Sequence, residues 1–301
     1  MNVALYRTLL DRQKAICKAF KNTTPPEEIM RQVILSVLKI KGIKDSSIEA
    51  WIIDSLYESR QRPSLIIENN YFIQHLLSSQ LDTDPKLLRY PLGGCFSINP
   101  PRNARAGGKP IPSFLFSVAP KREIAEWADK LFAAYQIPLG TSIWDEGLVY
   151  AVTYKDTSGA DITAEWTTDD VCKMLQTDPS EWTVLFNLEN QNCSRDEHLT
   201  MQVCFRLGFT ITLYCNAFPG SLVQGLPQTV LAFKQHMQNV HHLIGTDVFR
   251  TSPSAHLRSG HFRTLGHERF KRNPDGSVRV VFVHPCIVNA EIDPYTLEEQ
   301  P

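Results

Sequence analysis

The sequence predicts an α+β fold: a helical N-terminal part, then a mixed and mainly antiparallel sheet with packed helices, and a basic β-hairpin near the C-terminus. Apolar residues in the first 80 positions recur with a helical period. After Pro91, strand-like and helix-like segments alternate without a regular repeat, which is typical of α+β proteins. We therefore predict a helical region over 1–85 and an α+β body over 86–301, which contains the hairpin module at about 254–290.

The composition is that of a globular protein with an ordinary core. The chain has 301 residues, of which 43% are hydrophobic and 21% are charged, so its core needs no disulfide. Its formal net charge is −1, which excludes a histone-like protein that coats nucleic acid with its whole surface. Any contact with nucleic acid should therefore be local.

The seven cysteines are typical of reduced thiols in a cytoplasmic protein, because no Cys-x-x-Cys pair occurs. Cys193, Cys204 and Cys215 are eleven residues apart, which is too wide for one compact zinc site, so we expect no metal and no cofactor. The N-terminus has no apolar signal-peptide region, and the longest apolar stretch, 207–218, is too short to span a bilayer. The sequence thus predicts a cytoplasmic protein without a membrane partner.

Four helices are predicted in the N-terminal region. The first follows an apolar stripe over 3–20, and the second begins at a Thr24 cap that two prolines follow. The third and the fourth are expected over 45–56 and 71–77. These stripes are core positions, and we assign no chemistry to them.

Two short strands are expected at 95–98 and 114–118, on either side of a basic loop. The loop contains no acid and carries three cations, Arg102, Arg105 and Lys109. It is either an auxiliary arm that settles on phosphate or on an acidic partner, or a solvated excursion between two strands.

Helices and strands alternate irregularly in the middle of the chain. The sequence predicts a helix over 120–135, a hairpin of 147–154 with 161–166, a short helix capped by Thr167 or Thr168, and a strand over 182–188. This irregular order favours an α+β layer over a doubly wound sheet.

Ser194 and Glu197 form a capping-box pattern ahead of an apolar segment over 199–218. The pattern predicts one long buried helix, although the aromatic and β-branched residues over 209–214 also fit a strand. Arg206 is the only charge inside this segment, and we expect it to be paired structurally. A further helix is expected over 226–244. Its histidine pair, His241 and His242, would lie near the negative pole, which favours protonation, or would simply cap the helix.

The last fifth of the chain concentrates positive charge. From His256 to Phe282 there are six Lys/Arg residues against two acids, whereas the remainder of the chain has 25 against 30. The segments 260–265 and 278–283 resemble strands, and the Asn273-Pro274-Asp275-Gly276 sequence between them is a strong turn. We expect a rigid β-hairpin that displays cations at fixed spacing.

Three interpretations of this hairpin are open. In the first it binds nucleic acid, and the candidate residues are Arg258, His261, Arg263, Arg269, Lys271 and Arg272. In the second it is a metal-independent ribonuclease, in which His261 and His267 lie on one face of a strand and act as acid and base. In the third it is structural: Gly260 allows close packing, Phe262 enters the core, and arginines pair with the acidic tail of Glu291, Asp293, Glu298 and Glu299. We favour binding, because it requires only charge and hydrogen-bond donors.

The motif His256-x-Arg258-x-Gly260-His261-Phe262-Arg263, followed by Arg279-Val280-Val281-Phe282-Val283-x-Pro285 and Val288-Asn289, resembles the C-terminal signature of a group of phage- and plasmid-borne proteins. The group includes type V-A anti-CRISPR activity, in which production of the effector nuclease is lowered through recognition of its nascent N-terminal peptide. Phe262 stands where the group has tryptophan. The resemblance implies a non-enzymatic, mobile-element protein that recognises a protein or nascent peptide and contacts RNA or the ribosome to lower expression of a target.

Overall fold

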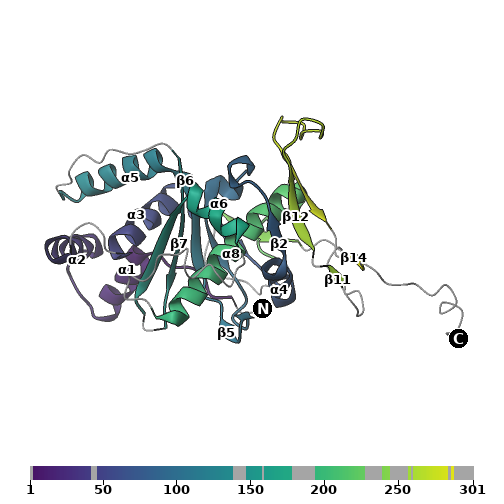
Figure 1. The fold of residues 1–301 in the computed structure, drawn as a ribbon. Coiled ribbons are helices and arrows are strands. Elements are labelled where there is room, and N and C mark those ends of the chain that lie inside the picture. The colour runs from purple at the N-terminus through teal and green to yellow at the C-terminus, as the bar shows by residue number, and fades with distance from the viewer. Residues whose placement is uncertain are drawn as a thin grey trace, which may run out of the picture.

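The computed structural model describes residues 3–41, 46–137, 147–157, 159–177, 194–227, 239–244, 257–258, 260–283 and 286–287. Helices and a mixed sheet make up the body, and a hairpin near the C-terminus projects from it (Figure 1), so the predicted α+β class is confirmed. None of the described helices combines the length and the apolar character that crossing a membrane would require. The predicted strand over 182–188 lies outside the described residues.

Seven strands form the main sheet, in the order β8-β7-β6-β3-β1-β10-β9. In chain order they are β1 (Ser64–Ile66), β3 (Cys95–Asn99), β6 (Phe114–Pro120), β7 (Leu148–Lys155), β8 (Asp161–Thr167), β9 (Leu222–Gln224) and β10 (Val240–Leu243). Strand β1 is parallel to β3 and β10, whereas every other described pair in this sheet is antiparallel. The predicted strands over 95–98 and 114–118, and the hairpin of β7 with β8, are confirmed.

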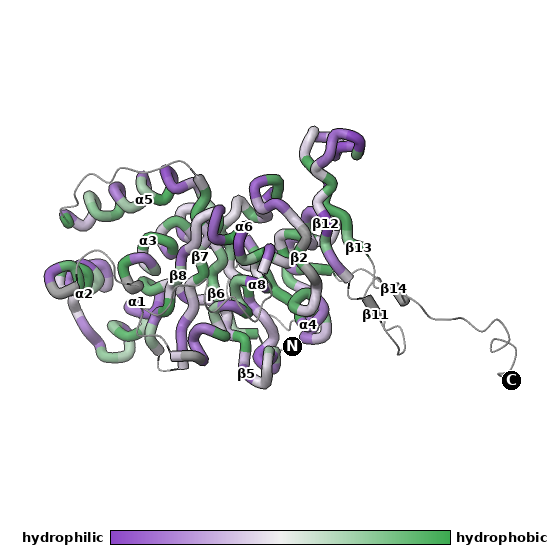
Figure 2. Tube along the Cα trace, in the orientation of Figure 1, coloured by the Kyte–Doolittle hydropathy of each residue, from purple (hydrophilic) through white to green (hydrophobic). Residues whose placement is uncertain are grey.

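Helices cover both faces of this sheet and make a three-layer body (Figure 1). On one face lie α1 (Leu9–Ala19), α2 (Pro26–Lys41), α3 (Ser46–Ser59) and α5 (Lys121–Ala134); on the other lie α4 (Asn70–Ser78), α6 (Thr168–Gln176) and α8 (Arg195–Ala217). Leu56 and Ile124 pack on the first face, while Phe72, Val171 and Phe205 pack on the second. Because strands β3, β6 and β7 are covered on both faces, nearly all of their residues are buried. Figure 2 shows apolar, green stretches in the middle of the body.

Helix α8 settles the choice between helix and strand that the sequence left open. Its capping box is formed: the Ser194 hydroxyl accepts from the Glu197 amide, and the Glu197 carboxylate accepts from the Ser194 amide. The β-branched residues inside the helix are accommodated because Thr210 and Thr212 each donate to the carbonyl four residues earlier. Gly208 lets the helix approach the sheet, since a Cβ there would lie 2.4 Å from the ring of Phe116.

Arg206 is paired, as the sequence predicted, but its partners are backbone atoms. Its guanidinium donates to the carbonyl oxygens of Leu77 at 2.6 Å and Ser79 at 2.5 Å. These carbonyls lie at the end of α4. The arginine therefore satisfies carbonyls that a helix end leaves without an intrahelical partner.

The apolar stripes had indicated an entirely helical N-terminal region, but this region also contains two strands. Residues Ser64–Ile66 form β1 in the middle of the main sheet, and Gln80–Asp82 form a further strand, β2, which pairs with the C-terminal hairpin. Both strands are three residues long, too short to show an alternating pattern. They join strands that come from beyond residue 85.

The predicted helix over 226–244 is wrong at its C-terminal end. Residues Val240–Leu243 form strand β10, because they find hydrogen-bonding partners in β1 on one side and β9 on the other. His241 and His242 are therefore strand residues and cap no helix. Burial lowers the pKa of His241, and His242 adds to this effect, whereas a hydrogen bond with Asn239 acts in the other direction. The net shift is opposite to the protonation that a helix C-terminus would favour.

Candidate nucleic-acid interface

The basic C-terminal hairpin forms as the sequence predicted. Strands β12 (His261–Leu265) and β13 (Arg279–Val283) pair antiparallel, with Phe262 opposite Phe282. The turn between them is closed by the Gly276 amide, which donates to the Asn273 carbonyl at 2.8 Å. Gly276 has a φ of +82°, a value that favours glycine. The Asn-Pro-Asp-Gly sequence thus makes the tight connection that its residue types indicate.

Two further pairings extend and support the hairpin. Strand β11 (Leu257–Arg258) pairs with β14 (Cys286–Ile287), in the same antiparallel register that joins β12 to β13. Strand β2 pairs parallel with β12 on its other side. The cationic segment is therefore built into a sheet of three strands, and this sheet projects from the body (Figure 1).

One face of the hairpin is anchored to the core. Phe262 is 0% exposed, and its ring centroid lies 4.9 Å from that of Phe282. Phe282 in turn packs near Phe218, directly after α8. A Cβ at Gly260 would lie 2.3 Å from the Cζ atom of Phe282, so this position requires glycine for close packing. Gly260 and Phe262 therefore have the packing roles that the structural interpretation predicted.

The cations of the hairpin point into solvent. The exposed residues are Arg263, Arg269, Lys271, Arg272 and Arg279. Within the part of the chain that the structure describes, none of these five forms an ion pair. The segment has only two acids, Glu268 and Asp275. The hairpin therefore keeps a net positive charge that phosphate groups can neutralise.

Arg89 adds to this surface, although nothing in the sequence connects it with the hairpin. Its guanidinium, 63% exposed, forms an ion pair with Asp275 in the turn. Its backbone is fixed to α8, because the Arg89 amide donates to the Asn216 side chain at 3.1 Å and the Arg89 carbonyl accepts from it at 2.7 Å. Hydrogen bonds from Ser277, and the nearby Arg89, lower the pKa of Asp275. Arg89 thus neutralises one of the two acids of the hairpin.

Arg279 is a second cation that the sequence-based candidates omitted. It lies opposite Leu265 at the turn end of the strand pair and is exposed. The outward position follows from the strand period of two, because Val280 beside it is buried. The alternation of this strand was therefore the signal that could have identified it.

The tip of the hairpin holds its side chains through local contacts. The Arg269 guanidinium lies 4.9 Å from the centroid of the Phe270 ring. The Arg269 amide donates to Nδ1 of His267 at 3.2 Å, and Arg272 donates to the Gly266 carbonyl at 3.1 Å. An arginine plane next to an aromatic ring is an arrangement on which an unpaired base can stack.

The structure does not place His261 and His267 on one strand, as the ribonuclease interpretation assumed. His261 is in β12, but that strand ends at Leu265, so His267 lies in the tip and not on the same strand face. The prediction that the two imidazoles share one face is therefore wrong. The reason is the turn itself, which begins before the strand period reaches residue 267.

The basic loop of Arg102, Arg105 and Lys109 does not join the hairpin. It contains the short strands β4 (Arg105–Ala106) and β5 (Lys109–Pro110), and Lys109 forms an ion pair with Asp196 at the start of α8. The hairpin instead packs near Phe218, at the far end of α8. At 1.5 Å per residue this helix of 23 residues is about 34 Å long, so the two groups of cations lie at its opposite ends (Figure 1).

Some of the residues that the sequence singled out lie within the described structure, and others lie outside it. Arg258 lies in β11, so its backbone continues the hairpin. His256 and the acidic tail lie outside the described residues. Cys204 is buried in α8, and burial raises the pKa of Cys215 in the same helix to about 12, while Cys193 is outside the described residues. Across the described segments, no group of three or more His, Cys, Asp or Glu side chains is placed to hold a metal ion.

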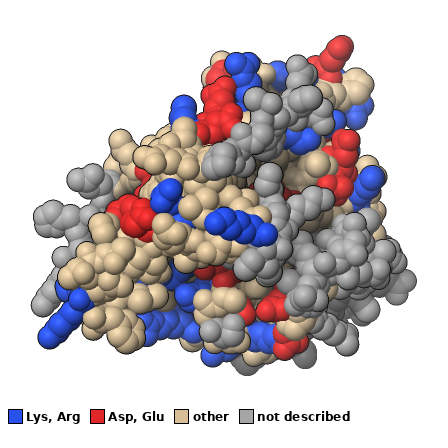
Figure 3. Space-filling view, turned by 90° about the vertical axis from the view of Figure 1, so that its left-hand side faces the viewer, with Lys and Arg blue, Asp and Glu red and all other residues tan. Residues whose placement is uncertain are grey.

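The opposite end of the molecule has a different charge pattern. Figure 3 shows Lys/Arg and Asp/Glu side chains of both signs between uncharged residues. Ion pairs such as Lys14 with Glu27 and Arg31 with Glu28 belong to this helical end. The hairpin therefore differs from this end, because its exposed cations have no ion-pair partner among the described residues.

Comparisons with known proteins do not add an identity to this geometry: no protein-family model, no curated protein and no solved structure matches the chain. The resemblance of the C-terminal motif to the phage- and plasmid-borne group therefore stays a prediction.

Proposed function

We propose that this protein binds RNA through the C-terminal hairpin and has no catalytic role there. The observation that carries the proposal is the set of five exposed cations, without ion-pair partners among the described residues, on a hairpin that is anchored by buried aromatic rings. Because the hairpin backbone that carries these cations is already paired, binding of a phosphate backbone does not have to order it. The net charge of −1 confines this attraction to one part of the surface.

The choice of RNA has two supports. Arg269 beside Phe270 at the tip suits unstacked bases, which single-stranded RNA offers and a DNA duplex does not. The resemblance of the motif adds a connection to translation or message stability. On that basis we also propose a cytoplasmic accessory protein of a mobile element, which recognises a protein or nascent peptide and lowers expression of a target while it contacts RNA or the ribosome.

The direct test replaces three exposed cations whose side chains form no hydrogen bond or ion pair within the described structure. The variant is Arg263→Gln, Lys271→Gln and Arg279→Gln. A matched control, with Lys18→Gln, Lys39→Gln and Lys155→Gln, removes the same charge from exposed positions on α1, α2 and β7. Binding of a labelled single-stranded RNA is measured by fluorescence anisotropy over a range of salt concentrations, with duplex DNA as competitor.

The hairpin variant should lose about tenfold or more in RNA affinity, and the slope of log affinity against log salt should fall by about 2. The control should bind as the wild type does, because its cations lie away from the hairpin. Equal losses in both variants would indicate bulk charge and contradict the proposal. Stronger competition by duplex DNA than by RNA would contradict the choice of RNA.

A structural role for the hairpin is the second candidate, and the packing of Gly260 against Phe282 favours it. Under this alternative the hairpin variant lowers the melting temperature and binds RNA no more weakly than the control does. Melting curves of both variants therefore separate the two functions. RNA binding predicts that the melting temperature is retained while affinity is lost.

A further inference from the structure

We propose that a cleft between α1, α3 and α5 binds a small organic cation with an apolar body. The cleft has a volume of about 260 Å³ and lies on the face of the sheet opposite α8. That volume is slightly below the range of pockets that take drug-sized molecules, so the ligand must be small. The site shares no residue with the hairpin, and the inference is independent of RNA binding.

Aromatic side chains form the apolar walls of the cleft. Trp51 and Tyr135 pack edge to face, with ring centroids 4.7 Å apart, and Trp127 lines the cleft beside them. The Lys130 ammonium lies 5.1 Å from the centroid of the Trp127 ring. This indole thus already attracts a cation, as the negative face of an aromatic ring does.

The hydroxyl groups in the lining present acceptors, because their hydrogens are already donated elsewhere. Thr8 donates to the Glu58 carboxylate at 3.0 Å, Ser55 to the Trp51 carbonyl at 2.8 Å and Ser59 to the Leu56 carbonyl at 2.6 Å. The Ser55 and Ser59 oxygens keep lone pairs that can accept, whereas the buried Thr8 oxygen already accepts from the Asp11 amide at 3.2 Å. A ligand that fills the cleft is therefore matched best if it donates hydrogen bonds.

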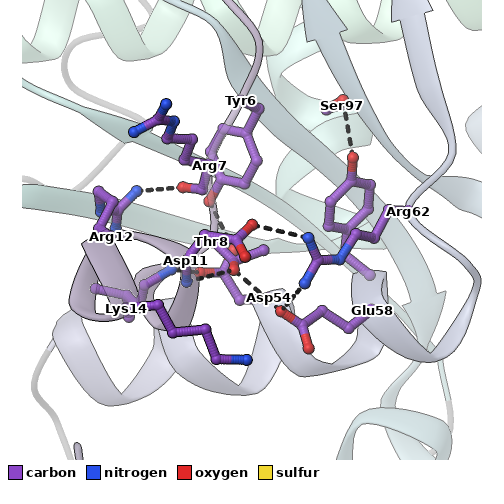
Figure 4. A network of polar contacts seen from close by, with 12 residues as sticks. Tyr6, Arg7, Thr8, Asp11, Arg12, Lys14, Asp54, Glu58, Arg62 and Ser97 are labelled. Atoms are coloured by element: carbon purple, nitrogen blue, oxygen red, sulfur yellow. Dashed lines mark hydrogen bonds and ion pairs between the residues drawn. The ribbon is translucent and has the colours of Figure 1, made fainter. Parts of the chain in front are cut away.

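Two carboxylates complete the polar side of the cleft (Figure 4). Asp54 is 2% exposed and accepts from the Tyr6 hydroxyl at 2.7 Å and the Leu9 amide at 2.6 Å. Glu58 accepts from Arg62 at 2.9 Å, but the same guanidinium also serves Asp11 at 2.8 Å. Arg62 is thus shared between Glu58 and Asp11, so Glu58 keeps part of its negative charge at the cleft.

These properties select a monovalent ammonium on an aromatic or alkyl group. The apolar part would contact the indole rings, and the ammonium would donate to the Glu58 carboxylate and to the Ser55 and Ser59 oxygens, because both Asp54 oxygens already accept hydrogen bonds. An anion of the same shape would be repelled by the Glu58 carboxylate. A neutral alcohol would contact the aromatic walls but lack the positive charge of the ammonium.

The test uses 2-phenylethylammonium chloride as the probe, with 2-phenylethanol and 3-phenylpropionate as the neutral and the anionic comparison. Affinities for the full chain are measured by calorimetry and by saturation-transfer NMR. We expect the ammonium to bind about tenfold more tightly than the alcohol, as a charge-assisted hydrogen bond would provide, and the carboxylate not to bind. Equal affinity for the ammonium and the alcohol, or failure of the ammonium to bind, would overturn the proposal.

Two variants place the ligand in this cleft. Glu58→Gln should weaken binding of 2-phenylethylammonium about fivefold to tenfold, because it removes a charge but keeps the shape. Its control, Glu126→Gln, removes an exposed carboxylate of α5 outside the cleft and should bind as the wild type does. Trp127→Ala leaves the carboxylates in place and tests the aromatic wall if Glu58→Gln lowers the melting temperature. Unchanged affinity in both Glu58→Gln and Trp127→Ala would also overturn the proposal.

Discussion

The substitution Asp54→Asn should remove a pH-dependent cost from the folded protein. Burial raises the pKa of Asp54 to about 7, although hydrogen bonds from Tyr6 and Leu9 act in the other direction. The asparagine has nearly the same shape. Its amide oxygen can accept from the Leu9 amide, and its amino group can donate to the Tyr6 oxygen. The variant therefore keeps the local contacts and loses only the ionisable group.

The magnitude follows from the difference between the folded and unfolded pKa values. The unfolded carboxyl titrates near its ordinary value of 3.8, and the folded one near 7. Between these values the folded state binds more protons, so the free energy of unfolding of the wild type falls as pH rises. The complete loss is about 4 kcal/mol, of which about 2 to 3 kcal/mol falls between pH 5 and pH 8.

Urea unfolding at pH 5 and pH 8, followed by tryptophan fluorescence, measures this effect. The difference between Asp54→Asn and the wild type should move in favour of the variant by about 2 to 3 kcal/mol over that range, with similar m-values. Other titrating groups affect both proteins alike and cancel in the difference. The reasoning is refuted if the variant and the wild type lose stability in parallel as the pH rises.

Two further predictions concern packing and capping. Gly260→Ala should lower the free energy of unfolding by about 1 to 3 kcal/mol, since its Cβ would overlap the ring of Phe282. In the double variant, Phe282→Leu should recover part of that loss. Additive losses in urea titrations would contradict this contact. Ser194→Ala should lower the free energy of unfolding by about 1 kcal/mol, because the N-terminal amides of α8 lose their cap. Its control, Ser36→Ala at an exposed position of α2, should lower it less. Equal effects of the two substitutions would argue against the capping box.

Local sequence signals located α8 and the C-terminal hairpin correctly. The Ser194 and Glu197 pair marks the start of a helix because both groups act within one turn, and neither needs a distant partner. The Asn273 to Gly276 turn and the alternation around it act over a similarly short range. These interactions are encoded by neighbouring residues, and the structure confirms them.

Strands β1, β2 and β10 could not be found in this way. Ser64–Ile66 forms the middle of the main sheet only because β3 and β10, distant in sequence, supply its hydrogen bonds on both sides. Val240–Leu243 becomes a strand for the same reason. A segment of three or four residues carries too little periodicity to compete with the helical pattern around it.

The cleft that we propose for an organic cation could also not be predicted from the sequence. Its lining joins Thr8 from the N-terminal segment, Asp54 and Glu58 from α3, and Trp127 from α5. The apolar stripes of the N-terminal helices were taken as core positions, which is correct for Ile34 and Leu56 but wrong for Ile16, Phe20 and Val33, whose side chains are exposed. That interpretation assigned no chemistry to any of them. Only the packing of the helices shows that the carboxylates and the indoles border one cleft.

The sequence by itself determined that residues 261–283 form a cationic hairpin, because the charges and the strand alternation both belong to one continuous segment. The tertiary structure decided which cations have partners. Lys109 pairs with Asp196 and Arg89 with Asp275, whereas Arg263 and Arg279 have no ion-pair partner among the described residues. An ion pair depends on the distance between two charges in space, and folding sets that distance between residues far apart in the chain.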